Sequence, residues 1–365
     1  MKEKLLKTPQ GAESIFLEEA YKHEKINEAI NKIYTEWGYL PIKTPVFDYY
    51  ENYEKLLSTN SKKNCFRLMD RDGELLLLRN DITLFLAKQL GRMLKESNQS
   101  FRVHYADSIL RHQSEIDISS NEFFQTGAEL VGCSGINGDL EAITLLLKII
   151  SELEIKDTKI HVGSRSILDA ILNKYNLIDS SCLIELINSR DLIKLKSYLN
   201  QFMDETNSNF ITKLFLFIGT FKDYLKFITT NKESIENNNI PNEIEYLKNI
   251  GDVLLDLDLI DNFRFDLSEI ANRDYYTGIV FKAYTKDIDS PIASGGRYDN
   301  LIKSFGNDIP SVGFSILLRK VEDRINNEVY NPPKIKNIYG KFVEAYREAE
   351  IMRNNGIPAI IKGEK

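Results

Sequence analysis

The apolar positions in the first hundred residues alternate between helical and extended spacing. Over residues 12–37 apolar side chains recur every three or four positions, and Gly38 follows where such a helix typically ends. Two strand-like runs then flank an Arg-Asp-Gly turn at 71–73, which predicts a β-hairpin over 65–79. A second helix is predicted over 82–95.

The middle of the chain places a long helical region between two groups of short strands. An apolar stripe predicts a helix over 139–153, and helical patterns with few Gly or Pro run through residues 167–257. We therefore expect a helical insert at about 165–258. Gly295 and Gly296 predict a tight turn. The predicted strands are 101–105, 108–113, 122–131, 158–162, 263–267 and 275–284, with one more strand and a helix within 311–325.

The composition changes again after residue 325. Paired Asn and paired Pro residues within 326–334 indicate a linker, and residues 335–365 have the pattern of one strand, one helix and one strand. A βαβ unit of this size is too small to form a stable domain alone. Residues 1–325 are expected to form the main domain, and its mostly antiparallel strands with flanking helices indicate the α+β class.

Composition and charge exclude several classes of protein. The 365 residues suit two or three domains, and a hydrophobic fraction of 42% supports a large core. The net charge of −7 disfavours a large RNA-binding or membrane-binding surface. No apolar run approaches the roughly 18 residues of a membrane span, and the N-terminus lacks the apolar core of a secretory signal. We therefore expect a cytoplasmic protein.

Metal sites and the common nucleotide and hydrolase motifs are not predicted. The three cysteines form no CxxC pair, and the four histidines are not spaced for a metal site. No Walker loop, GxGxxG, GxSxG or HExxH sequence occurs. The informative residues are instead polar side chains placed inside predicted strands.

The strand EFFQTGAELV, residues 122–131, carries the most informative polar pattern. Strand alternation places Gln125 and Glu129 on one face, with Gly127 between them. The amide and the carboxylate lie on either side of a glycine, which has no side chain. Their oxygens could accept hydrogen bonds from an ammonium group and a ring N–H of a small ligand. The alternative is an outer sheet face in contact with water, since polar strand faces are usually solvated.

Four further segments have both a structural and a functional interpretation. Asp81 follows a strand and precedes a helix, where Asn80 or Asp81 would make an ordinary N-cap. Arg111 ends a strand, so it is either a surface residue or the partner of an anionic ligand. Tyr275 and Tyr276 either pack in the core or bond a ligand ring. The sequence Gly-Gly-Arg at 295–297 is either a plain turn or a ligand floor with an arginine nearby.

The order of these segments is more specific than any one of them. LRNDIT (78–83), the strand to Arg111, EFFQTGAELVG (122–132), RDYYTGIVF (273–281) and SGGRYDNL (294–301) follow one another along the chain. In this order, residues 10–325 resemble the catalytic domain of the class II histidyl-tRNA synthetases and its paralogue, the regulatory subunit of ATP phosphoribosyltransferase.

The resemblance implies a fold, a dimer and a ligand. The fold would be a six- or seven-stranded antiparallel sheet flanked by helices, and the dimer would form through the region of Pro45. The ligand would be histidine: the amino acid would be held by Asp81, Thr83, Gln125 and Glu129, its ring would lie beside Tyr275 and Tyr276, and Arg111 matches the arginine of the second class II motif. No cofactor and no metal are implied.

Three positions depart from the synthetase pattern where that family handles ATP. Ala271 stands in place of an activating arginine, Gln113 in place of a glutamate, and Lys320 in place of an arginine. Alanine cannot stabilise phosphoryl charge, and lysine lacks the planar fork of arginine. Residues 335–365 are also much shorter than an anticodon-binding domain of about 100 residues. We therefore expect histidine binding without activation chemistry and without tRNA.

Two functions remain open on these grounds. The resemblance implies a non-catalytic regulatory subunit of a glycosyltransferase complex, ATP phosphoribosyltransferase, in the first step of histidine biosynthesis. It would associate with a short catalytic subunit and make it sensitive to histidine. The alternative is a diverged histidine-activating ligase, in which Arg273 or Lys320 replaces the lost groups. A structural scaffold without a ligand is a minor third option, because it would leave buried polar groups without partners.

Overall fold

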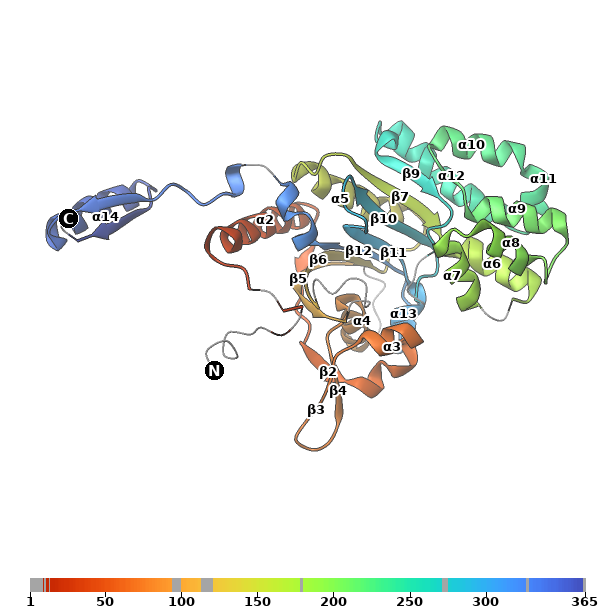
Figure 1. Cartoon of the computed structure of the whole chain (residues 1–365), viewed down its shortest axis with the longest axis horizontal. Coiled ribbons are helices and arrows are strands. Elements are labelled where there is room, and N and C mark those ends of the chain that lie inside the picture. The colour runs from red at the N-terminus through yellow and green to blue at the C-terminus, as the bar shows by residue number, and fades with distance from the viewer. Residues whose placement is uncertain are drawn as a thin grey trace.

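A mixed sheet forms the centre of the molecule (Figure 1). The computed structural model describes residues 9, 11–12, 14–93, 100–112, 121–177, 180–270, 275–325 and 328–363. Within these residues the main sheet has nine strands, and its order across the sheet is β1 (Leu40–Pro41), β5 (Phe101–Leu110), β6 (Glu122–Val131), β12 (Ser311–Leu317), β11 (Ala293–Arg297), β10 (Ile279–Thr285), β7 (Thr158–Ser164), β9 (Phe263–Asp266) and β8 (Ile218–Gly219).

The α+β prediction is confirmed, with one refinement. The six strands from β5 to β7 in this order are antiparallel to one another, as the resemblance implied. The sheet as a whole is mixed, because β1 runs parallel to β5 and β9 runs parallel to β7. The runs 101–105 and 108–113, predicted as two strands, belong largely to the single strand β5.

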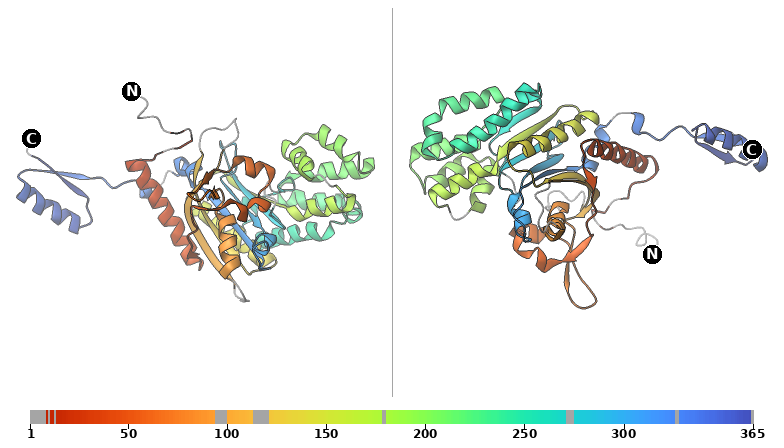
Figure 2. Two further views of the ribbon diagram at one scale, coloured as in Figure 1. Left: turned by 90° about the horizontal axis from the view of Figure 1, so that it is seen from below. Right: turned by 180° about the vertical axis from the view of Figure 1, so that it is seen from behind.

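Helices cover the two faces of the sheet unequally. On one face lie α2 (Leu17–Glu36) and α5 (Ile136–Glu152), which bury their apolar stripes against β-strand side chains. The opposite face carries α4 (Ile82–Met93), α13 (Asp299–Lys303) and α3 (Thr59–Asn64), together with a small sheet in the order β2 (Phe47–Tyr49), β4 (Leu75–Leu78), β3 (Arg67–Met69) (Figures 1 and 2). The β3–β4 pair is the hairpin that the Arg-Asp-Gly turn predicted.

The helical insert lies at the β9 end of the sheet (Figure 1). Its helices are α6 (Arg165–Tyr175), α7 (Ser180–Ser189), α8 (Leu192–Leu199), α9 (Glu205–Phe215), α10 (Phe221–Thr230), α11 (Lys232–Asn237) and α12 (Pro241–Asp256). The helical pattern of this stretch did not reveal β8, which pairs with β9 and so joins the insert to the sheet. A two-residue strand is too short to produce an alternating pattern.

Two predictions near the second half of the sheet are wrong. Gly295 and Gly296 lie inside β11 and form no turn. Both are glycines because another residue occupies the space above each: a methyl group at Gly295 would collide with Phe281, and one at Gly296 with Tyr276. The strand predicted over 275–284 begins only at Ile279, so Tyr275 and Tyr276 precede it.

The last described residues form a separate small unit. The parallel strands β13 (Lys336–Tyr339) and β14 (Ala359–Lys362) pack against α14 (Phe342–Asn354) through a core of Ile338, Ala345, Ala349 and Ala359. All views show this unit standing away from the main sheet (Figures 1 and 2). Residues 326 and 327 of the expected linker lie outside the described residues.

Short 3-10 helices complete the secondary structure: η1 (Tyr50–Asn52), η2 (Glu54–Leu56), η3 (Ile260–Asn262), η4 (Leu318–Lys320), η5 (Glu322–Arg324) and η6 (Glu328–Tyr330). No helix in the described part of the chain has both the length and the apolar character that crossing a membrane requires.

Candidate functional site

Glu129 is the centre of a buried polar site on the sheet. It lies near the C-terminal end of β6, and its side chain reaches over Gly313 of the neighbouring strand β12. A methyl group at position 313 would collide with the Glu129 carboxylate, so only glycine fits there. Glu129 is 1% exposed. A carboxylate this deeply buried needs hydrogen-bond donors around it.

Three hydroxyl groups supply these donors. Thr83 at the start of α4 donates to Oε1 at 2.6 Å, Tyr298 donates to Oε2 at 2.6 Å, and Tyr105 of β5 donates to Oε1 at 3.3 Å. Burial raises the pKa of Glu129 from 4.5 to about 7, although the three hydroxyl bonds oppose this shift. The carboxyl group is therefore poised between its neutral and charged forms near neutral pH.

Gln125 lies on the same face of β6, as strand alternation predicted. It is 2% exposed, and its Oε1 is buried with no hydrogen-bond donor from any residue that the structure describes. The bare floor expected at Gly127 is not open, because the phenol of Tyr105 occupies the space above this glycine. The site is therefore narrower than the sequence indicated, and its unpaired acceptor is the amide oxygen of Gln125.

Asp81 serves both as a helix cap and as part of the site. The backbone N–H of Leu84 donates to its Oδ1 at 3.2 Å, which caps α4, and the phenol of Tyr275 donates to its Oδ2 at 3.2 Å. The rings of Tyr275 and Tyr276 lie 5.1 Å apart, and Tyr276 lies over Gly296. The structural and the functional interpretations of Asp81 are therefore compatible.

Arg111 follows β5 at the edge of this site. Its backbone forms an isolated antiparallel β-bridge with Cys65, and its guanidinium lies 5.0 Å from the centre of the Phe123 ring. Burial lowers its pKa, with a small opposing effect from Tyr275. Among the described residues its guanidinium has no hydrogen-bond or ion-pair partner. A half-buried arginine in this state favours an anionic ligand. Gln113, two positions later, lies outside the described residues.

The structure thus brings most of the predicted residues together. Hydrogen bonds join Thr83 to Glu129 and Tyr275 to Asp81. The two pairs meet through ring packing, because Tyr275 packs edge to face against Tyr298, which itself donates to Glu129, and Tyr276 packs against Tyr275. Sequence analysis missed Tyr105 and Tyr298. Tyr298 was visible inside the SGGRYDNL segment, whereas Tyr105 is identified only by its register opposite Gly127.

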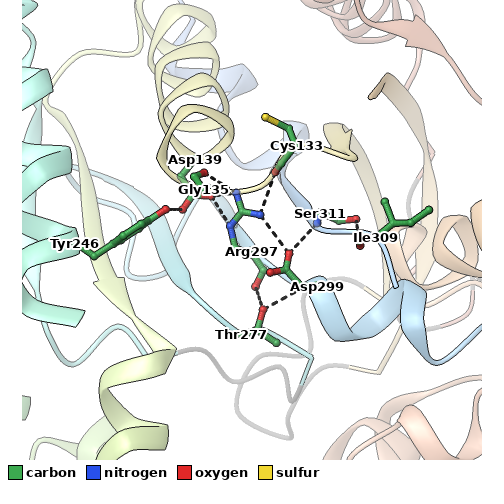
Figure 3. Close-up of polar contacts among 9 residues, drawn as sticks. All are labelled: Cys133, Gly135, Asp139, Tyr246, Thr277, Arg297, Asp299, Ile309 and Ser311. Atoms are coloured by element: carbon green, nitrogen blue, oxygen red, sulfur yellow. Dashed lines mark hydrogen bonds and ion pairs between the residues drawn. The ribbon is translucent and has the colours of Figure 1, made fainter. Parts of the chain in front are cut away.

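Arg297 does not face a ligand, contrary to one interpretation of the Gly-Gly-Arg sequence. Its guanidinium is bound to Asp139 at 2.6 Å and to the carbonyl oxygens of Cys133 and Gly135 at 3.2 and 3.0 Å (Figure 3). Asp299 lies on its other side at 3.2 Å. With these acceptors the guanidinium has a structural role, because it fixes the start of α5 to the end of β11.

Of the three positions that depart from the ATP-handling pattern of the synthetases, only Lys320 lies among the described residues. Lys320 lies in η4 and donates to the Ser290 hydroxyl at 2.5 Å. Ala271 and Arg273 lie outside the described residues. The departures at these positions therefore remain arguments from sequence.

Comparisons with known proteins agree with the motifs. The family model described as Histidyl-tRNA synthetase matches residues 11–321. The ATP phosphoribosyltransferase regulatory subunit of Clostridium kluyveri is 28% identical over 97% of this chain and 92% of the relative. The protein of the same name from Thermoanaerobacter pseudethanolicus is 28% identical over 98% of this chain and 99% of the relative.

Solved structures show the same fold. The crystal structure titled ATP phosphoribosyltransferase regulatory subunit/histidyl-tRNA synthetase, from Bacillus halodurans C, superimposes with a TM-score of 0.86 at 22% identity, covering 98% of this chain and 93% of the other. Histidyl-tRNA synthetase from Nostoc sp. PCC 7120 gives 0.80 at 21% identity, covering 99% and 86%.

Proposed function

The chain belongs to the histidyl-tRNA synthetase family, and we propose that within it the protein is a histidine-binding regulatory subunit of ATP phosphoribosyltransferase. The names of relatives that align along nearly the whole chain support the subunit role. The observation that carries the ligand is the buried acceptor set of Asp81, Gln125 and Glu129, in which the Gln125 oxygen has no donor within the described part of the chain. A ligand rich in N–H groups would complete this set.

Histidine matches the acceptors and the cation of the site. Its ammonium group would bond Asp81 and Gln125, and an imidazole N–H would bond Glu129 beside the tyrosine rings. Its carboxylate would neutralise the guanidinium of Arg111, which has no partner in the described part of the chain. The Gln125 oxygen and the Arg111 guanidinium would then each have a partner of complementary chemistry.

Catalysis by this chain is not part of the proposal. The positions of Ala271, Gln113 and Lys320 carry side chains that do not replace the ATP-binding groups of the active family members. Histidine would instead act by binding one assembly state of the complex better than another, because a ligand shifts an equilibrium only by its differential affinity. The partner would be a short-form catalytic subunit that condenses ATP with phosphoribosyl pyrophosphate.

The direct test is phosphoribosyl transfer by the short catalytic subunit of the same genome. We expect a large gain in rate when this protein is added, and a loss of that gain when histidine is added. No gain would contradict the subunit role. Rapid histidine-dependent ATP–pyrophosphate exchange by the protein alone would instead establish the alternative, a histidine-activating ligase.

We also propose that the protein forms a dimer through its small sheet. The small sheet, the strand β1 and the chain between them expose several large apolar side chains. Grouped apolar residues of this kind typically mark a protein interface, whereas single exposed apolar residues do not. The members of this patch are Leu40, Val46, Phe47, Tyr49, Leu68, Met69 and Leu75. Val46 and Phe47 follow Pro45 directly in the sequence, and the resemblance places the dimer contact in the Pro45 region.

Charge on this patch is expected to separate the dimer. Phe47 and Met69 are 54% and 70% exposed, so Phe47→Asp and Met69→Asp leave the core intact. We expect each to raise the dimer dissociation constant at least about 100-fold, because a carboxylate would be buried without a partner. Sedimentation velocity measures this. Leu255→Asp, on an equally exposed site of α12, is the control that should remain dimeric. A dimer unchanged by both patch variants would contradict the proposal.

A further inference from the structure

A second charged cluster lies on the same face of the sheet as the Glu129 site. Asp266 at the end of β9 is 1% exposed, and its Oδ2 is bound by His161 of β7 at 3.0 Å and by Arg190 at 3.1 Å. Glu269 is bound by Lys282 at 2.6 Å and by the Tyr284 phenol at 2.6 Å. None of these residues takes part in the proposed histidine pocket.

The cluster has the residue types of a metal site, but its carboxylate oxygens are already engaged in hydrogen bonds and ion pairs. His161, Asp266 and Glu269 offer atoms within 4.8 Å of one another. Each oxygen of both carboxylates, however, already accepts a bond, since Ser268 donates to the remaining Asp266 oxygen at 2.5 Å. Two of the donors, Arg190 and Lys282, are cations that would repel a metal ion. The arrangement is therefore a compensated ion cluster.

Arg190 is the member of this cluster that comes from the helical insert. It follows α7 with a φ of +53°, a left-handed conformation in which helices usually place glycine or asparagine. Its guanidinium donates to Asp266 and, at 2.9 Å, to the hydroxyl of Ser268. An arginine in an unfavourable backbone conformation is explained if its side chain is needed for this contact.

Asp266 and Glu269 also lie close to the pocket itself. The backbone of both residues rests on Gly163 of β7, where a methyl group would collide with their carbonyl oxygens. Gly163 and Gly296 are both paired with Val280 of β10, so they occupy one row across the sheet. Tyr276 lies over Gly296. The anchored segment and the pocket tyrosine are thus two strand spacings apart, or about 10 Å.

We propose that Arg190 is a positioning residue that couples the helical insert to the pocket. By holding Asp266 and Ser268, it fixes residues 266–270 on Gly163, in the same row of the sheet as Gly296, which lies under Tyr276. A ligand that orders the two tyrosines would then stabilise the attachment of the α7–α8 corner, and displacement of that corner would loosen the tyrosines. That the ligand is histidine rests on the proposed function, whereas the coupling does not.

The test uses the full chain with three variants. Arg190→Gly removes the side chain and suits the left-handed backbone, so the fold should survive. Arg190→Lys keeps a cation that can reach Asp266 but cannot bond Ser268 as well. Lys194→Gln is the control, because Lys194 lies in the same corner and, among the described residues, its ammonium pairs only with Asp191.

Hydrogen exchange without ligand and calorimetry with histidine are then compared. For Arg190→Gly we expect exchange at least about fivefold faster in residues 263–270 and also in residues 275–280, and a histidine dissociation constant five- to tenfold higher. Arg190→Lys should be intermediate, and Lys194→Gln should match the wild type. A residue that merely anchored the insert would speed exchange in α7 and α8 and leave the pocket residues and the dissociation constant unchanged, which would overturn the proposal.

The same measurements separate this proposal from the proposed function. If the wild type shows no heat of histidine binding, the histidine role is wrong, and the coupling is decided by exchange alone. Faster exchange in residues 275–280 of Arg190→Gly would then still support the coupling, and unchanged exchange there would overturn it.

Discussion

Replacing Glu129 with glutamine is expected to weaken histidine binding by about 30-fold or more while it stabilises the ligand-free protein above pH 7. The loss of binding follows from the exchange of a charged acceptor for an amide: a hydrogen bond to a charged group contributes about 2 kcal/mol. The gain in stability follows from the burial of the carboxylate, which is costly in the absence of a ligand.

The sign of the stability change is set by the raised pKa. Between pH 4.5 and about 7 the unfolded chain loses the Glu129 proton while the folded protein keeps it. The folded state therefore loses stability as pH rises through this window, by an amount on the order of 3 kcal/mol. Glutamine does not titrate, so the variant should be close to the wild type at pH 4.5 and more stable at pH 8. Urea unfolding at both pH values, with calorimetry for histidine, measures the two effects.

A second buried glutamate provides a matched control. Burial alone would raise the pKa of Glu322, but its bonds with His23 and Arg319 outweigh this effect and lower it. The stability that Glu322 contributes is therefore present above its ordinary pKa and is lost as pH falls. Glu322→Gln should destabilise the protein at pH 8 and leave histidine binding unchanged. Equal effects of the two substitutions would contradict the site assignment of Glu129.

Replacing Arg297 with methionine is expected to destabilise the fold by about 3–5 kcal/mol. Asp139 is 0% exposed, and without Arg297 its remaining side-chain partner is the Tyr246 phenol at 2.6 Å (Figure 3). Removing one partner of a buried ion pair leaves the other charge uncompensated. This costs more stability than replacing both partners with uncharged residues. Two backbone carbonyl groups also lose their donor.

Urea unfolding with two companion variants checks this explanation. In the double variant Arg297→Met with Asp139→Asn the buried charge is gone, so part of the lost stability should return. Arg324→Met removes an arginine whose pair with Asp287 is exposed, and it should change stability by less than about 0.5 kcal/mol. A similar loss in Arg297→Met and Arg324→Met would show that the buried network contributes little.

The candidate site was predicted well where local geometry decides the outcome. Gln125 and Glu129 share a face because side chains alternate along any strand, whatever surrounds it. Asp81 stands between a strand and a helix, where its carboxylate caps α4 and also accepts a hydrogen bond from Tyr275. The order of the motifs then identified the family, because several short patterns in one order are far more specific than each alone.

Other features depended on contacts between distant parts of the chain. Tyr105 fills the space above Gly127 because β5 pairs with β6 in one particular register, and no local pattern encodes that register. Gly295 and Gly296 were interpreted as a turn because paired glycines usually make one, yet here the rings of Phe281 and Tyr276 require the missing side chains.

The sequence by itself determined the fold class, the face that carries Gln125 and Glu129, and the family. These follow from periodicities of two and about 3.6 residues and from short motifs, all of which are set within a few neighbouring residues. Only the tertiary structure decided that Arg297 is bound to Asp139, that three hydroxyl groups surround Glu129, and that Arg190 of the insert reaches Asp266. Such contacts join residues far apart in the chain, and the packing of whole elements chooses among the many partners that each polar side chain could have.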